Sequence, residues 1–343
     1  MGRGGAVEGD SMMRVHTRVE RLPLRAPFRI SRGVKTHAEV VLAELGDGSF
    51  TGLGECVPYA RYGETPASVS AQLEAAAMRL AAGEPARVVA ASMPAGAARN
   101  ALDCALWDLE ARRDGRSVAE SLGRHLPQTL TTAVTISLAE PEAMRDAAAA
   151  AADAPLLKVK LDADRPAERL LAVAEAAPDA RLIVDPNESW TLAVLQAMAG
   201  PISRLRVAVV EQPLPAGEDA VLAGLTYPAP ICADESVHTA ADVEQAARRY
   251  QMVNVKLDKA GGLTEALAMA DRARALGLGV MAGCMVSSSL AIAPALFVGG
   301  VADLVDLDGP WWLREDRPGG CRLQGGMLLS PQPGFWGEPG SRP

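Results

Sequence analysis

Five short apolar segments in the second half of the chain each carry a charged residue at their end. The segments are LLKVKL, LIVDPN, VAVVEQP, ICADES and MVNVKLDK, and their charged positions are Lys158 and Lys160, Asp185, Glu211, Asp234 and Lys256. From Lys160 onward the intervals are 25, 26, 23 and 22 residues. A β-strand with its returning helix takes about that much chain. A charge at the end of a buried parallel strand is costly unless it has a partner or a task, so this row predicts a functional site.

The same spacing extends to a count of eight strands. We expect strands at 131–137, 156–161, 181–185, 207–211, 230–234, 252–257, 278–283 and 302–307, with alanine-rich helical stretches between most of them. Eight strands alternating with helices are typical of a (β/α) barrel, in which the chemistry lies at the carboxyl ends of the strands. Every charged residue of the row lies at such an end.

The chain before this region has a different pattern. Alternating residues from Arg14 to about Ala43, followed by the turn residues GDGS, predict an antiparallel sheet whose strands are joined by a loop, PFRISRGVKTH. Helical patterns follow at 68–82, 95–114 and 118–122. We therefore expect an α+β unit that is distinct from the barrel.

Composition excludes several classes of function. The net charge of −8, with no run of Lys and Arg, argues against a nucleic-acid partner. The five cysteines are scattered without CxxC pairs, which is typical of a reducing, cytoplasmic compartment. The stretch 275–302 is uncharged, but five glycines, a proline and three serines favour a buried barrel unit over a membrane span. The opening MGRGGAVEGDSMM lacks the apolar centre of a secretory signal, and Met12 or Met13 is an alternative start.

Asp185, Glu211 and Asp234 end three consecutive predicted strands. Three carboxylates that meet at one barrel mouth repel one another unless a cation lies between them. A small set of oxygen ligands suits Mg²⁺, which keeps positions open for water or substrate. Each residue alone is also explained as a helix N-cap at a strand–helix junction. That explanation is weak for three residues in successive units.

Lysines lie on both sides of these carboxylates in the strand order. Lys158 and Lys160 share one face of their strand, and Lys256 ends a strand across the barrel. A single lysine in a strand is usually solvated at an edge, but the flanks are apolar here. A lysine that acts as a base needs its pKa brought from about 10.4 toward ~7–8, and a divalent cation or a neighbouring ammonium acts in that direction.

Asp306 and Asp308, in LVDLDGP, lie two residues apart at the end of the last predicted strand. They share one face and predict a site for a substrate ammonium group. A turn at Asp308-Gly309-Pro310 accounts for Asp308 but leaves Asp306 unexplained.

Together these residues resemble a known family. The order KxK, Asp, Glu, Asp and Lys is similar to that of the enolase superfamily in its muconate lactonizing enzyme-like subgroup, and the DxD pair looks like the dipeptide epimerases within it. The resemblance covers roughly Arg14 to Trp312, through GECVPYARYGET, MPAGAARNALDCALWDLEARR, LLKVKLD, VNVKLDKAGGLTEAL and DLDGPWWL.

The resemblance implies a fold of the α/β class, a modified (β/α)₇β TIM-like barrel with an α+β capping domain. We expect a disordered N-terminal tail at 1–13, the capping domain at 14–128, the barrel at 129–310, and a C-terminal segment at 311–343 that returns to the capping domain. Asp185, Glu211 and Asp234 are then expected to hold one Mg²⁺ per subunit.

The resemblance also implies roles for the remaining site residues. Lys160 and Lys256 are expected to be the two acid/base residues, while Lys158 helps to neutralise the substrate carboxylate. Asp306 and Asp308 would take the α-ammonium group of a dipeptide.

The loop around 28–35 is expected to close over the site and contact the substrate side chain. Arg32, and then Arg29, are the expected contacts to a glutamate carboxylate, although both are equally explained as solvated loop charges. Pro186 departs from relatives, which commonly carry a small residue there, and is expected to stiffen the loop without touching the ligand Asp185.

The expected reaction is 1,1-proton transfer at the α-carbon of the C-terminal residue of a dipeptide, from L-Ala-L-Glu to L-Ala-D-Glu and back. A role in recycling cell-wall peptides follows from the resemblance only. The expected partner is a small-molecule dipeptide, with no nucleic acid and no membrane, and a homo-oligomer is compatible with the sequence.

Two other classes of function stay open. One is a cycloisomerase or an o-succinylbenzoate synthase-type lyase of the same architecture, and the other is a non-catalytic barrel that binds an anion. The substrates of those lyases, and of N-acyl amino acid racemases, carry no ammonium group, so the Asp306–Asp308 pair would have no partner in them. A binding protein has no need of two opposed bases.

Overall fold

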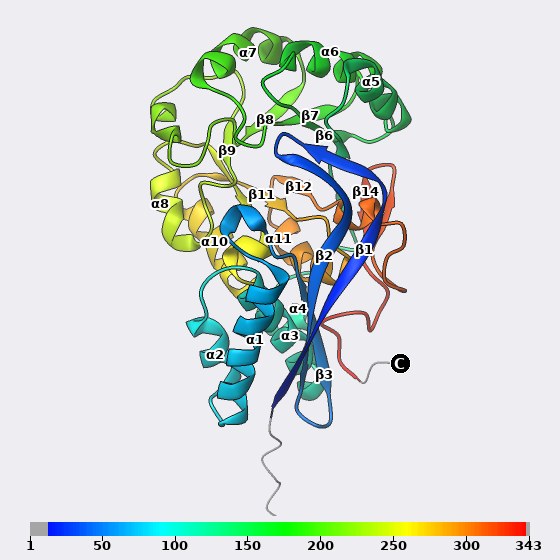
Figure 1. The fold of residues 1–343 in the computed structure, drawn as a ribbon, viewed down its shortest axis with the longest axis vertical. Coiled ribbons are helices and arrows are strands. Elements are labelled where there is room, and N and C mark those ends of the chain that lie inside the picture. The colour runs from blue at the N-terminus through cyan, green and yellow to red at the C-terminus, as the bar shows by residue number, and fades with distance from the viewer. Residues whose placement is uncertain (1–12, 341–343) are drawn as a thin grey trace, which may run out of the picture.

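The computed structural model describes residues 13–340, so the expected tail at 1–13 lies outside the described residues except for Met13. Within that range the strands form three sheets (Figure 1). An antiparallel sheet has the order β1-β2-β3, a parallel sheet has the order β12-β11-β10-β9-β8-β7-β6-β5, and a small antiparallel sheet has the order β13-β14-β4.

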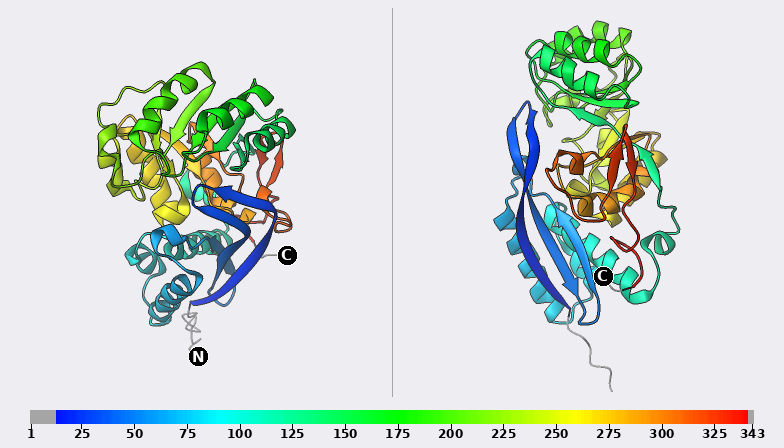
Figure 2. Two further views of the ribbon diagram at one scale, coloured as in Figure 1. Left: turned by 45° about the horizontal axis from the view of Figure 1, so that its top comes forward. Right: turned by 90° about the vertical axis from the view of Figure 1, so that its right-hand side faces the viewer.

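The N-terminal sheet is covered on one face by helices, as the right-hand view of Figure 2 shows. Its strands are β1 (Arg14–Ile30), β2 (Gly33–Gly46) and β3 (Thr51–Cys56). The short turn η1 (Ala60–Tyr62) leads to the helices α1 (Pro66–Ala81), α2 (Ala86–Ser92), α3 (Ala97–Asp114) and α4 (Val118–Leu122). Three of these helices match the expected ones, and α2 was not expected.

The interpretation of residues 27–37 as a loop is wrong. The strands β1 and β2 continue through them as a hairpin, with Phe28 opposite Lys35 and Ile30 opposite Gly33. Most of these residues are exposed, so they lack the apolar alternation that marks a half-buried strand. The hairpin extends away from the helices (Figure 1). Its tip contacts the segments that follow β5 and β7, where the Leu138 N–H donates to the Arg29 carbonyl and Arg32 donates to the Asn187 carbonyl.

Two glycines of β3 let helix α3 pack directly against the sheet. A Cβ atom at Gly52 would lie 2.1 Å from the carbonyl oxygen of Ala105, and one at Gly54 would lie 2.0 Å from that of Ala101. Contacts this short require the backbone to move, so β3 needs glycine at both positions.

All eight expected barrel strands are present, and each neighbouring pair is parallel. They are β5 (Val134–Ile136), β6 (Leu156–Lys160), β7 (Arg181–Asp185), β8 (Val207–Glu211), β9 (Ile231–Ala233), β10 (Met252–Val255), β11 (Gly279–Gly283) and β12 (Leu304–Asp306). The ring closes where the Ala133 N–H donates to the carbonyl of Val305 at 2.8 Å.

Helices fill most of the seven connections. They are α5 (Pro141–Ala150), α6 (Pro166–Ala176), α7 (Leu192–Arg204), α8 (Val243–Ala246), α9 (Leu257–Ala260), α10 (Leu263–Ala275) and α11 (Ser289–Gly299), with 3₁₀ turns η2 (Asp219–Leu222) and η3 (Ala240–Asp242). The connection between β8 and β9 has only η2. Of the helices in residues 13–340, none has the length and apolar content that crossing a bilayer requires.

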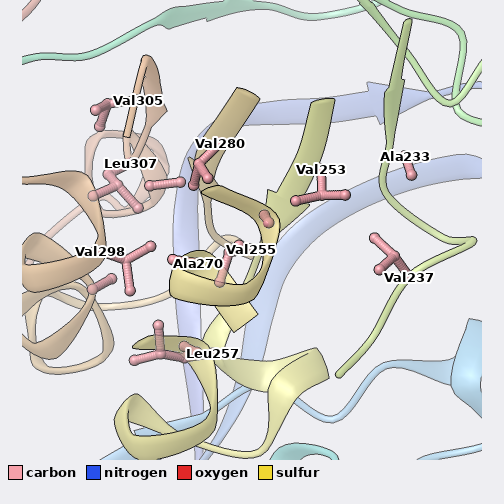
Figure 3. Close-up of a cluster of buried hydrophobic side chains, with 14 of the residues drawn as sticks. Ala233, Val237, Val253, Val255, Leu257, Ala270, Val280, Val298, Val305 and Leu307 are labelled. Atoms are coloured by element: carbon pink, nitrogen blue, oxygen red, sulfur yellow. The ribbon is translucent and has the colours of Figure 1, made fainter. Parts of the chain in front are cut away.

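The outward faces of the barrel strands form one core with the surrounding helices. Val253 of β10 and Val280 of β11 belong to the same buried cluster as Ala270 of α10 and Val298 of α11 (Figure 3). This cluster runs round the barrel and fixes how each strand is rotated about its own axis.

The inward faces form two layers. An apolar floor of buried side chains comprises Ala133, Leu156, Ile183, Val209, Cys232, Met252, Met281 and Leu304. Two residues further along the chain from each of these lie Thr135, Lys158, Asp185, Glu211, Asp234, Asn254, Gly283 and Asp306. Because side chains alternate along a strand, the floor determines that this second, mostly polar layer also points into the barrel.

The chain returns to the N-terminal unit after the barrel. The turn η4 (Gly309–Trp312) leads to β13 (Arg322–Gln324) and β14 (Met327–Leu329), and β14 pairs with β4 (Thr129–Thr131). Beyond these strands, the Trp336 indole N–H donates to the Leu53 carbonyl at 3.0 Å. The exact limits at 14–128, 129–310 and 311–343 stay predictions.

We expect Gly54→Ala to destabilise the fold by about 1–3 kcal/mol or more, because its Cβ would collide with the backbone of α3. Gly46→Ala is the matched control in the same sheet, since its Cβ would have no contact closer than 3.6 Å. Urea unfolding measures both. Equal midpoints for the two variants would contradict the packing described for β3.

We also expect stability to depend on Asp258, which joins α9 to the N-terminal unit. Its Oδ1 accepts from the Val57 N–H at 3.0 Å and from Asn100 Nδ2 at 2.8 Å. Burial raises its pKa to about 7. The unfolded pKa is about 3.9, so the folded state binds more protons between these values, and the free energy of unfolding falls as the pH rises from about 4 to about 7.

Asp258→Asn keeps the Oδ1 acceptor but has no carboxyl group to titrate. The urea midpoint of this variant should therefore fall less between pH 4 and pH 7 than that of the wild type. Asp146→Asn, on the exposed face of α5, serves as the control and should follow the wild type. An unchanged pH profile in Asp258→Asn would refute this assignment.

Candidate active site

The polar layer opens into a cavity of about 750 Å³ between the barrel mouth and the N-terminal hairpin. The barrel contributes Lys158, Lys160, Asp234, Lys256, Asp306 and Asp308 to its lining, and the hairpin side contributes Arg32. Asp185 and Glu211 are completely buried beneath it. Arg29 is exposed and is not among the lining residues; its backbone N–H donates to Ser137 Oγ.

Lys158 lies at the centre of the layer. Its Nζ is 2.7 Å from Asp306 Oδ2, 2.7 Å from Glu211 Oε2 and 3.1 Å from Asp185 Oδ2. Burial acts to lower the pKa of Lys158, but the three carboxylates outweigh it and raise the pKa well above its usual range. Lys158 is therefore a fixed positive charge in a layer of negative ones.

Lys160 and Lys256 lie on opposite walls. Strands β6 and β10 are four places apart in the eight-stranded ring. Lys160 Nζ is 2.5 Å from Asp185 Oδ2, and Lys256 Nζ is 2.7 Å from Asp234 Oδ2. Burial acts to lower the pKa of Lys256, but Asp234 and Glu211 raise it above the usual value. The ion pair with Asp234 therefore favours the ammonium form of Lys256, the reverse of the pKa shift expected for a base.

Two further residues, not recognised in the sequence, support this layer. Asn254 Nδ2 donates to Glu211 Oε1 at 2.8 Å, and a Cβ at Gly283 would lie 2.4 Å from Asn254 Oδ1. Lys259 is completely buried and its Nζ donates to Asp234 Oδ1 and to three backbone carbonyl oxygens. An Asn inside the apolar run MVNV was the one sequence signal for Asn254.

The three predicted ligands are not yet arranged around a common point. Within residues 13–340 no group of three or more His, Cys, Asp and Glu side chains forms a ready metal site. Instead, the Lys158 ammonium contacts both Asp185 and Glu211, Lys160 pairs with Asp185, and Lys256 pairs with Asp234.

The donor set nevertheless fits a hard divalent cation. Asp185, Glu211 and Asp234 supply only oxygen atoms, as Mg²⁺ prefers, and all three are buried. Glu211 Oε2 is buried without a hydrogen bond, although it lies near Lys158. Burial and the nearby Asp185 raise the pKa of Glu211 to about 8, which marks a carboxyl group with too little positive charge around it.

Asp306 and Asp308 differ in the hydrogen-bond partners of their carboxylate oxygens. Asp306 Oδ2 contacts Lys158, whereas its Oδ1 is buried without a hydrogen-bond partner. Asp308 Oδ2 accepts from the Thr135 N–H at 2.8 Å and from the Trp312 indole N–H at 3.4 Å. Burial and the neighbouring Asp306 raise the pKa of Asp308 to about 6. A cation at this wall would satisfy both carboxylates.

The hairpin tip contacts the barrel through charged groups. Arg32 NH2 donates to Glu235 Oε1 at 2.7 Å and to the Tyr59 hydroxyl at 3.1 Å, and its NH1 donates to Glu188 Oε2 at 3.1 Å. Arg61 of η1 binds the same Glu188 through two bonds of 2.8 Å. The sequence carried no signal for Glu188, Glu235 or Arg61, because their partners lie more than 100 residues away or on another unit.

Comparison with family models and relatives agrees with this geometry. Residues 142–335 match the model described as Enolase C-terminal domain-like, and residues 12–123 match the Mandelate racemase / muconate lactonizing enzyme, N-terminal domain. The chain is 50% identical over 299 residues to the L-Ala-D/L-Glu epimerase of Escherichia coli K12, which covers 87% of this chain and 93% of that protein. It is 43% identical over 304 residues to an N-acetyl-D-glutamate racemase of a Pseudoalteromonas species, covering 87% and 95%.

Solved structures give the same grouping. An enolase family member from Agrobacterium tumefaciens with homology to dipeptide epimerases, with bound sodium and L-Ala-L-Glu, superposes with a TM-score of 0.92 at 47% identity and covers 95% of this chain and 100% of that one. A dipeptide epimerase from Enterococcus faecalis V583 complexed with Mg and L-Leu-L-Tyr has a TM-score of 0.83 at 25% identity, covering 93% and 97%. This chain belongs to the mandelate racemase and muconate lactonizing enzyme family of the enolase superfamily.

Proposed function

We propose that this protein is a Mg²⁺-dependent dipeptide epimerase, an isomerase that interconverts L-Ala-L-Glu and L-Ala-D-Glu by inverting the α-carbon of the C-terminal residue. The observation that carries the proposal is the placement of Lys160 and Lys256 on opposite walls of one cavity, with Asp306 on a third wall. Relatives and solved neighbours named as dipeptide epimerases support it.

Two opposed lysines suit inversion. The lysine on one face, in its neutral form, takes the α-proton, and the electron pair of the C–H bond moves into the carboxylate to give an enediolate. The ammonium group on the other face then donates its proton to the α-carbon, which inverts the stereocentre. Lys160 and Lys256 exchange these roles when the other epimer is the substrate.

The enediolate carries two negative charges and needs fixed positive charge around it. Asp185, Glu211 and Asp234 would hold one Mg²⁺ per subunit, and when bound this ion supplies such charge to the substrate carboxylate. Lys158, buried and held as an ammonium group, supplies more from the protein itself.

Asp306, Asp308 and Arg32 are suited to position the substrate in the cavity. The unpaired Asp306 Oδ1 is suited to accept a hydrogen bond from the dipeptide ammonium, with Asp308 beside it. Arg32 lines the cavity from the hairpin and is suited to bind a glutamate side-chain carboxylate.

All five cysteines are free, which supports a reducing, cytoplasmic compartment.

A second candidate is racemisation of an N-acylated glutamate, favoured by the identity to the N-acetyl-D-glutamate racemase. Such a substrate has the same α-carboxylate and side chain but no ammonium group. The buried Asp306 Oδ1 would then have no cation to bind, and we prefer the dipeptide for this reason. Asp306→Asn should impair L-Ala-L-Glu turnover much more than turnover of N-acetylglutamate if the dipeptide is the substrate.

We expect Lys160→Ala and Lys256→Ala each to reduce epimerisation by at least about 10²-fold, because each removes one of the two proton-transfer groups. In D₂O each variant should still exchange the α-hydrogen of one epimer, and the two variants should differ in which one. NMR of L-Ala-L-Glu and L-Ala-D-Glu measures this. Retained epimerisation in both variants would rule out the two-base mechanism.

Magnesium should raise the thermal unfolding midpoint, since it binds only the folded state. We expect Glu211→Gln to lose this rise, whereas Glu142→Gln, an exposed residue of α5, should keep it. Differential scanning calorimetry with MgCl₂ and with EDTA gives the comparison. A full magnesium response in Glu211→Gln would show that the ion binds elsewhere.

A further inference from the structure

The segment after β7 turns sharply and directs a carboxylate at the hairpin. Asn187 and Glu188 both have left-handed backbone angles, with φ of 47° and 67°. Such angles in two successive residues other than glycine are unfavourable and persist only where the surroundings enforce them. Here Asn187 bonds Asp185 through its backbone N–H and its amide, and the Glu188 N–H donates to the Gln212 carbonyl.

The Glu188 carboxylate is the meeting point of two arginines from the N-terminal unit. Arg61 binds both of its oxygens at 2.8 Å, Arg32 contacts Oε2 at 3.1 Å, and the Ala216 N–H donates to Oε1 at 2.8 Å. The Glu188 side chain is only 8% exposed, so its charge needs these partners.

Both terminal nitrogens of Arg32 are engaged in this arrangement. Its NH1 and NH2 groups donate to Glu188, Glu235, the Tyr59 hydroxyl and the Asn187 carbonyl. A substrate carboxylate that binds NH1 of Arg32 takes the place of the Glu188 carboxylate there, so Arg32 exchanges a protein carboxylate for the substrate.

Arg61 determines how much free energy it costs to release Arg32 from Glu188. With Arg61 in place, Glu188 keeps two charge-assisted bonds when Arg32 leaves it. Without Arg61, Arg32 would be the one guanidinium bound to Glu188, and its departure would leave a nearly buried carboxylate without a cation, which is strongly unfavourable.

We propose that Arg61 is a specificity-determining positioning residue: by holding Glu188 it frees Arg32 to bind the side-chain carboxylate of an acidic dipeptide. This inference rests on the proposed function, since it concerns the substrate of that same cavity. Glu188 would have the opposite effect on the preference for an acidic dipeptide, because it competes with the substrate for Arg32.

The test compares two dipeptides that differ only in side-chain charge, L-Ala-L-Glu and L-Ala-L-Gln. Titration calorimetry with MgCl₂ gives the ratio of their dissociation constants, and NMR in D₂O follows α-hydrogen exchange in parallel. We expect Arg61→Met to lower the preference for L-Ala-L-Glu about tenfold, the size of one charge-assisted hydrogen bond. Glu188→Gln should raise that preference.

The double variant R61M/E188Q separates the proposal from direct contact. If Arg61 acts through Glu188, R61M changes the preference less than about twofold in the E188Q background. If Arg61 itself binds the substrate, R61M lowers the preference equally in both backgrounds, and the inference is wrong. Arg79→Met, which removes the exposed Arg79–Glu84 pair of α1, should leave the preference unchanged.

Two other outcomes also decide the question. Equal weakening of both dipeptides by R61M, with the preference unchanged, would show that the Arg61–Glu188 pair only holds the hairpin side to the barrel, and would overturn the inference. Absence of α-hydrogen exchange with either dipeptide in the wild type would overturn the proposed function, while the binding ratios would still decide the role of Arg61.

Discussion

The active layer depends on one geometric constraint, the two-residue step from the apolar floor of the barrel to its polar mouth. Leu156, Ile183 and Cys232 are held inward by packing. The residues two places further on, Lys158, Asp185 and Asp234, therefore point inward as well. A slip of one residue would turn them toward the helices. The large outer core thus fixes the position of charges that it does not contact.

Buried charge in this layer is nearly, but not fully, compensated by lysines. Lys158 faces three carboxylates, yet Glu211 keeps a raised pKa and an oxygen without a hydrogen bond. The ion pair with Asp234 favours the charged form of Lys256. Binding of Mg²⁺ to the carboxylates would draw negative charge away from the lysines, and we infer that metal and base function are coupled in this way.

The sequence predicted the barrel and the polar residues at its strand ends because both follow from spacing and from the alternation of side chains. It did not predict the extension of the hairpin over 27–37, where most residues are exposed and the pattern of a half-buried strand is weak. Asn254 depends on the space left by Gly283 on the next strand, which no local pattern reveals. Arg61 and Glu188 meet across units, through a left-handed turn that belongs to the fold and not to composition.

The central claim is that two lysines act on opposite faces of one α-carbon. The most direct test is the wild-type reaction of unlabelled L-Ala-L-Glu with Mg²⁺ in D₂O, followed by NMR and mass spectrometry during the first turnovers. The two-base account predicts that the L-Ala-D-Glu formed carries deuterium at the inverted carbon. L-Ala-D-Glu that keeps the original hydrogen at the inverted carbon would contradict it.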